Sequence, residues 1–165
     1  NTRYLRSNYQ YQQYWPITHR VTFGFNGELG WGVGLEGRTY PVFKNFYGGG
    51  LGSVRGFAQG TLGPLDVTGA YVGGNRRLNL NGELYVPFPG VGNDRSLRLF
   101  GYVDAGNVWG VGEKWDIGNS LRSSVGVGLS WISPVGPLKL SFGSPYRRKP
   151  EDKIERFQFQ IGSAF

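Results

Sequence analysis

The stretch Val21–Trp31 reads VTFGFNGELGW, and its residues alternate in character one by one. One set of alternate positions is mainly apolar: Val21, Phe23, Phe25, Leu29 and Trp31. The other set consists of small or polar residues: Thr22, Gly24, Asn26 and Glu28. A period of two places these sets on opposite faces of a β-strand. The stretch therefore predicts a strand with one apolar and one polar face.

Six further stretches repeat this alternation along the chain. Their apolar positions are Leu5, Tyr9 and Tyr11; Leu78, Leu80, Leu84 and Val86; Leu97, Leu99 and Val103; Val125, Val127, Leu129 and Trp131; Leu138, Leu140 and Phe142; and Phe157, Phe159, Ile161 and Phe165. No window keeps apolar residues at helical spacing for three turns. The sequence predicts an all-β protein with about seven antiparallel strands.

The connections between these strands fall into two classes that take turns along the chain. Short turns are expected at Pro16–His19, Pro87–Asp94 and Ser133–Pro137, and long loops at about 33–74, Gly110–Ser120 and Ser144–Lys153. In an antiparallel sheet, all long loops then lie at one end. Outer-membrane barrels have this asymmetry, with long extracellular loops and short periplasmic turns. The pattern predicts a portion of a multi-pass transmembrane β-barrel in the lipid of the bacterial outer membrane.

Aromatic residues near the strand ends agree with this prediction. They are expected to form interfacial girdles, with Trp15, Phe88, Trp131 and Phe165 toward the short turns and Trp31 and Trp109 toward the long loops. A soluble antiparallel sandwich or lipocalin-like barrel is the alternative, because its apolar face would form a core. The polar positions are rich in Gly, Ser, Asn and Gln and poor in charge, which favours the membrane barrel.

Composition excludes several other classes of protein. The net charge is +7, but the basic residues are scattered and form no stripe for nucleic acid. The chain has no cysteine, and its only histidine, His19, falls in an expected turn without a nucleophile or acidic pair around it. We therefore expect no enzyme activity, no metal site and no cofactor.

The long loop contains GGGLGSVRGF at Gly48–Phe57, and its last residues resemble the VRGF motif of the Omp85 family. Further similar segments are GEL at Gly82–Leu84, VDAG at Val103–Gly106, ISPVGPL at Ile132–Leu138 and FQFQIG at Phe157–Gly162. The resemblance extends over essentially the whole chain. It implies that residues 1–165 are the C-terminal portion of a larger barrel. The upstream strands and the periplasmic POTRA domains are then expected to lie outside this chain, which also explains an odd number of strands.

The motif residues Val54, Arg55, Gly56 and Phe57 lie in a loop too long to be idle surface, and we expect it to fold inward. An arginine inside the barrel needs acceptors, and strand parity places Glu83 and Asp104 on the lumen side. The resemblance implies that these two carboxylates are the partners of Arg55. In the alternative interpretation Arg55 is a solvated loop charge and the carboxylates line a wet pore.

The end of the chain resembles the C-terminal signal of outer-membrane barrels, with Phe157, Phe159, Ile161 and Phe165 on one face. Gly162 matches a family position where the last strand bends at a lateral seam, although a glycine there also suits simple close packing. The resemblance implies assembly and insertion of β-barrel proteins into the outer membrane by templated strand addition at that seam. A secretion transporter of the two-partner type within the same family and a passive porin are the alternatives.

The implied partners are outer-membrane lipid, nascent outer-membrane proteins and, in the full-length protein, periplasmic lipoproteins of the assembly complex. Unpaired edge strands also make self-association of this portion plausible.

Overall fold

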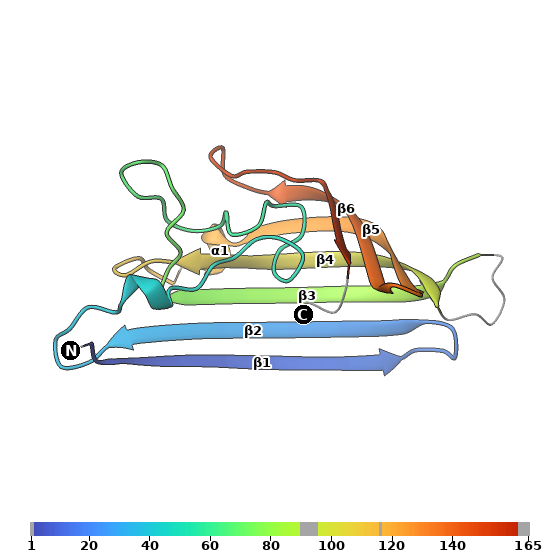
Figure 1. The fold of residues 1–165 in the computed structure, drawn as a ribbon, viewed down its shortest axis with the longest axis horizontal. Coiled ribbons are helices and arrows are strands. Elements are labelled where there is room, and N and C mark those ends of the chain that lie inside the picture. The colour runs from blue at the N-terminus through green and yellow to red at the C-terminus, as the bar shows by residue number, and fades with distance from the viewer. Residues whose placement is uncertain (1, 90–95, 116, 162–165) are drawn as a thin grey trace.

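The structure is a computed structural model that describes residues 2–89, 96–115 and 117–161. Its strands are β1 (Tyr4–Pro16), β2 (Thr22–Gly34), β3 (Arg76–Pro87), β4 (Leu97–Trp109), β5 (Arg122–Ser133), β6 (Gly136–Arg147) and β7 (Phe157–Ile161). They form one sheet in chain order, and each strand is antiparallel to its neighbours (Figure 1). The predicted all-β fold of seven strands is confirmed.

Two very short helical segments interrupt the loops of this sheet. One is a 3₁₀ turn, η1 (Val42–Lys44), in the long loop, and the other is α1 (Ile117–Ser120), between β4 and β5. Among the described residues no helix has the length and apolar character needed to cross a membrane.

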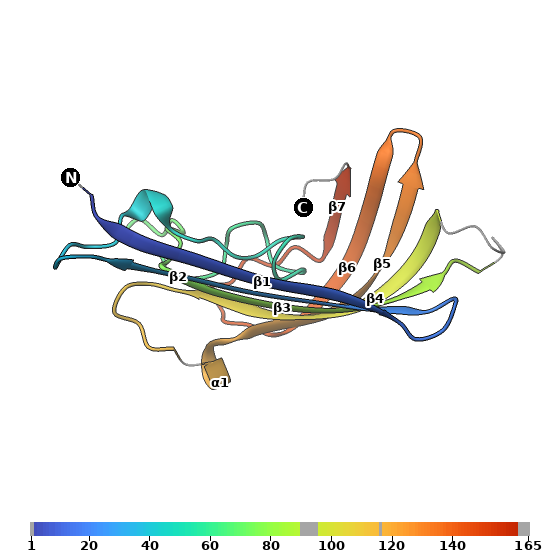
Figure 2. The ribbon, with the colours of Figure 1, turned by 90° about the horizontal axis from the view of Figure 1, so that it is seen from below.

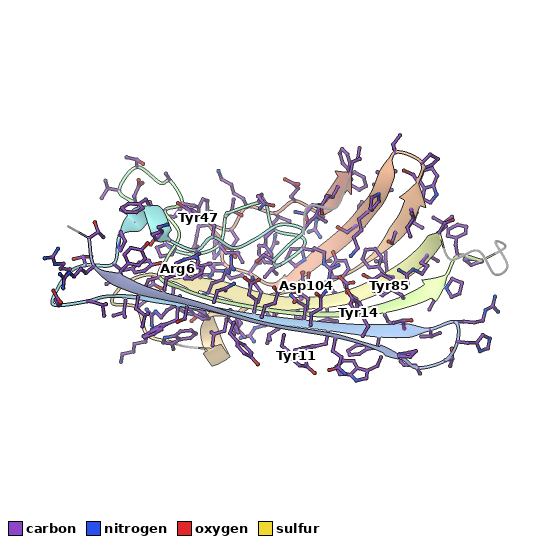
Figure 3. The ribbon with its side chains drawn as sticks, turned by 60° about the horizontal axis from the view of Figure 1, so that its bottom comes forward. Arg6, Tyr11, Tyr14, Tyr47, Tyr85 and Asp104 are labelled. Carbon is purple, nitrogen blue, oxygen red and sulfur yellow. The ribbon has the colours of Figure 1, made fainter. Side chains whose placement is uncertain are left out.

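The sheet is curved, and the loop of residues 35–75 lies over its concave side (Figure 2). We call the concave side, which carries Glu28, Glu83 and Asp104, the inward face. Figure 3 shows Asp104 on the side where this loop lies, whereas Tyr11 lies on the opposite side. Most of the buried residues lie on the inward face and in the long loop, so the core sits inside the curve.

The opposite, outward face carries the apolar residues of the alternation, and many of them are exposed. Examples are Leu29, Val103, Val127, Phe142 and Phe159. In a soluble sandwich this face would be covered by a second layer. Within the described part of the chain no second sheet covers it, and a continuous exposed apolar surface of this kind suits lipid. The alternative of a soluble sandwich is therefore not supported.

One expected girdle residue, Trp109, lies elsewhere. Its side chain is 1% exposed, and its ring centroid lies 5.0 Å from that of Trp115. The Arg76 guanidinium stacks 5.4 Å from the Trp115 ring and donates a hydrogen bond to the Gly110 carbonyl. The loop after β4 thus folds back onto the outward face and buries Trp109, so the girdle prediction is wrong there. Trp15, Trp31 and Trp131 are exposed as a girdle requires, and Phe165 lies outside the described residues.

The boundary of β6 also differs from expectation. The sequence predicts a loop from Ser144, but β6 continues to Arg147. The register of β5 and β6 shifts between Ser123 and Ser124, opposite Pro145. An irregularity in a ladder accommodates a proline, which has no N–H to donate. The last loop therefore comprises residues 148–156.

Candidate functional site

The inward-folded loop is built on itself before it meets the sheet. Isolated β-bridges join Phe46 to Gly74 and Gly48 to Leu62, which draws its two ends together. Val54, Phe57 and Leu62 are fully buried in one apolar cluster. This cluster fixes the segment between them, and so it fixes the position from which the Arg55 side chain leaves the backbone.

Arg55 is 2% exposed and lies against two carboxylates of the inward face. Its Nε and Nη2 donate to the two oxygens of Asp104, at 2.7 and 2.8 Å, and its backbone N–H donates to Asp104 Oδ2 at 3.0 Å. Its Nη1 lies 2.5 Å from Glu83 Oε1. The structure thus brings the motif arginine together with the two carboxylates of β3 and β4, and Arg55 is not a solvated loop charge.

The planar Arg55 guanidinium makes hydrogen bonds along its edge and an aromatic contact on its face. The bidentate pair with Asp104 uses two parallel N–H groups, a geometry that lysine cannot reproduce. The guanidinium carbon also lies 3.9 Å from the centroid of the Tyr102 ring. Burial alone would lower the pKa of Arg55, but the hydrogen bond and charge of Asp104 and the charge of Glu83 raise it above its ordinary value. Arg55 is therefore a permanent cation.

The two carboxylates differ in their surroundings. Asp104 is completely buried, and every bond described for it goes to Arg55. Glu83 is 16% exposed at its side chain, lies 3.6 Å from Lys139 Nζ and accepts a hydrogen bond from the Tyr85 hydroxyl. Asp104 is therefore the closed end of the site and Glu83 its open end.

Several polar residues of the inward face hold the loop backbone, and sequence reasoning did not single them out. Asn81 donates to the Ser53 carbonyl at 2.6 Å, and the Ser124 hydroxyl donates to the Arg55 carbonyl. The Ser53 hydroxyl donates to Asn79 Oδ1 at 2.7 Å. Asn79, Asn81 and Ser124 occupy inward positions of their strands, so strand parity was the available signal, but parity gives no distance to a loop.

The C-terminal residues divide between the two faces. Phe157, Phe159 and Ile161 point outward, and each is more than half exposed. Gln158 points inward and is 5% exposed, with its amide against the motif backbone. Gly162 and Phe165 lie outside the described residues.

Other side chains that could act in catalysis or bind a metal do not converge on this site. His19 lies in the turn between β1 and β2, far along the chain from the motif and at the short-turn end. Among the described residues, no group of three or more histidine, aspartate or glutamate side chains could hold a metal ion.

Comparison with known proteins gives a consistent family. The Omp85 superfamily domain matches residues 1–165. An outer membrane protein assembly factor BamA of Neisseria meningitidis serogroup B is 40% identical over 192 aligned residues, which cover 99% of this chain and 24% of that protein. BamA of Nitratidesulfovibrio vulgaris is 33% identical over 76% of this chain and 16% of that protein.

A solved structure supports the same assignment. The crystal structure of BamA from Haemophilus ducreyi lacking POTRA domains 1–3 superimposes with a TM-score of 0.84 at 30% identity, over 96% of this chain and 34% of that one. The chain thus spans about a quarter of the length of its Neisseria relative. On its sequence, its strand order and its anchored loop, the chain belongs to the Omp85 superfamily.

Proposed function

We propose that this chain is the C-terminal part of a bacterial outer-membrane barrel that assembles and inserts other β-barrel proteins. The observation that carries the proposal is the Arg55 anchor, in which one loop arginine binds carboxylates of two adjacent strands. It fixes a long loop inside the curved sheet and leaves the outward apolar face to the lipid. Three bacterial relatives of this chain bear the name of outer membrane protein assembly factor BamA.

The proposed mechanism is templated strand addition without a covalent step. Within the described residues the outer edges of β1 and β7 pair with no further strand. Such edges offer backbone donors and acceptors to an added strand. In the whole protein we propose that β7 borders a lateral seam, with Gly162 and Phe165 completing the terminal segment. A nascent outer-membrane protein would add its strand there.

We propose further partners on the same basis. The name of the Haemophilus structure refers to POTRA domains, and we propose that such domains and additional strands precede residues 1–165 in the whole protein. Periplasmic lipoproteins of the assembly complex would bind outside the part described. The same free edges would cause self-association of residues 1–165 on their own.

A passive porin and a secretion transporter fit less well. A porin needs an open lumen, whereas the loop of residues 35–75 lies over the concave side of this sheet, where its motif residues are buried (Figure 2). The names of the matching bacterial relatives favour assembly over secretion.

Complementation with the full-length protein tests the proposal. In cells depleted of the native factor, Arg55→Ala is expected to lower the steady-state level of client barrels at least about ten-fold, because the loop loses a buried bidentate anchor. Arg55→Lys is expected to restore only part of the level, since an ammonium is a point charge. Arg148→Ala, at an exposed loop position, is the matched control. Normal client levels in the Arg55→Ala strain would refute the proposal.

A further inference from the structure

Within the described residues, the terminal strand β7 pairs with β6 over only five positions. It comprises five residues, Phe157–Ile161, paired with Leu138–Phe142 of β6, whereas the other strands run for 12 or 13 residues. Among the described residues its other edge has no strand partner. A strand that is paired along one edge is held by the sheet from one side only, so contacts outside the sheet add to what fixes its position.

Gln158 supplies such a contact to the motif loop. Its Oε1 accepts from the Gly56 N–H at 3.2 Å, and its Nε2 donates to the Phe57 carbonyl at 2.8 Å. A primary amide presents one acceptor and one donor side by side, as a peptide group does. Gln158 therefore pairs with the motif backbone as a neighbouring strand would, and both of its polar atoms are used while it is 5% exposed.

The segment that leads into β7 continues this pairing. The Glu155 N–H donates to the Gly56 carbonyl and the Ala58 N–H donates to the Lys153 carbonyl, both at 2.9 Å. Phe57 and Ile154 form a β-bridge, and Ile154 packs against the apolar cluster of the loop. The motif and residues 153–158 are thus joined along their length.

Both partners of this junction are fixed elsewhere. The motif is anchored to β3 and β4 through Arg55. The last loop is anchored by a second buried ion pair, in which Arg122 Nη2 lies 3.1 Å from Asp152 Oδ1 and the side chains are 5% and 1% exposed. The Gln158 amide is the last of these contacts before the strand pairs with β6 alone.

We propose that Gln158 is a positioning residue that holds the terminal strand β7 to the Arg55-anchored loop. The inference deepens the proposed function, because it names what fixes the strand at the seam. Loss of the amide removes the hydrogen bonds between β7 and the loop, and it leaves the Arg55 anchor, the pairing of residues 153–155 and the strands β3 and β4 intact. The loop, which Arg55 fixes to β3 and β4, then positions the terminal strand β7 through the hydrogen bonds of Gln158.

Amide hydrogen exchange in the full-length protein tests this inference. Gln158→Met keeps the length of the side chain and removes both hydrogen bonds. It is expected to speed exchange of the Phe157–Ile161 amides about ten-fold or more, with unchanged exchange around Glu83 and Asp104. Gln160→Met is the matched control, because Gln160 occupies the next inward position of the same strand and its Oε1 is unbonded in the described structure. It is expected to leave β7 exchange unchanged.

Each result decides the inference. Equal exchange in the Gln158→Met and Gln160→Met proteins would overturn it, as would a rise of the same size in β3 and β4, which indicates global destabilisation. If Gln158→Met does not fold, Gln158→Asn replaces it, since a shortened amide cannot reach both backbone groups. The exchange readout does not depend on assembly activity, so the proposed function stands or fails separately on the Arg55 variants.

Discussion

Two carboxylates share one guanidinium at the site, yet their contributions to stability are expected to differ. Asp104 is completely buried and bound on both oxygens, so its removal leaves the Nε, Nη2 and backbone N–H of the buried Arg55 without their acceptor. Glu83 is partly exposed and also neighbours Lys139. Its removal leaves Arg55 with its bidentate partner.

We therefore predict that Asp104→Asn lowers the free energy of unfolding by about 3 kcal/mol or more, as for other broken buried pairs. The loss of unfolding free energy in Glu83→Gln is expected to be smaller than in Asp104→Asn by about 1 kcal/mol or more, because Gln keeps an acceptor at a partly hydrated position. Urea unfolding of the full-length protein in detergent measures both. Equal losses would contradict the distinction between the closed and open ends of the site.

The loop backbone at the motif imposes a requirement on Gly56. Its φ is +92°, a conformation that a residue with a side chain adopts only under strain. A Cβ at this position would lie 3.2 Å from Cγ of Pro145 in β6. Gly56 is therefore needed both for its backbone and for the close approach of the loop to the sheet.

Gly56→Ala is predicted to destabilise the folded barrel by about 1–2 kcal/mol through backbone strain. Gly52→Ala is the control in the same loop, since its φ is not positive and a Cβ there meets nothing within 4 Å. The two variants are compared by the temperature at which the band of the folded, heat-modifiable barrel disappears on a gel. A loss of equal size in both variants would show that the strain at Gly56 is not what matters.

At the scale of elements, the sequence predicted the strands because their alternation is a local property. Successive residues such as Phe25 and Asn26, or Leu78 and Asn79, point to opposite faces of a strand whichever strands lie beside it. The sequence could not predict that β6 passes through Pro145, because the register shift there, which skips Tyr146, depends on how β6 pairs with β5. Nor could it predict the burial of Trp109, which depends on how the following loop folds back.

The site divides in the same way. Parity placed Glu83 and Asp104 on the inward face, and the motif resemblance named Arg55 as their partner. Gln158 had the correct parity as well, but so did Gln160 two residues later. The choice between them depends on where the loop backbone runs, and contacts over about 100 residues of sequence leave no mark in the local pattern.

At the scale of the whole molecule, the two faces of the sheet have opposite requirements. The inward face is buried by a loop of the same chain, and its polar groups are paired there. The outward face exposes apolar side chains along five or more strands. Only a surrounding apolar phase reconciles such a surface with stability in a chain whose interior is polar.

Replacing valine by arginine at two positions tests this arrangement. Val127 lies outward in the middle of β5 and is 63% exposed, whereas Val135 is 79% exposed in the turn between β5 and β6. For the full-length protein folded into phospholipid vesicles, Val127→Arg is predicted to lower the free energy of unfolding by about 2–4 kcal/mol, because arginine near the bilayer midplane loses hydration. Val135→Arg is expected to change it by about 0–1 kcal/mol, as at an interface. In water both exposed positions would tolerate arginine, so equal small effects in vesicles would mean that lipid does not contact the outward face.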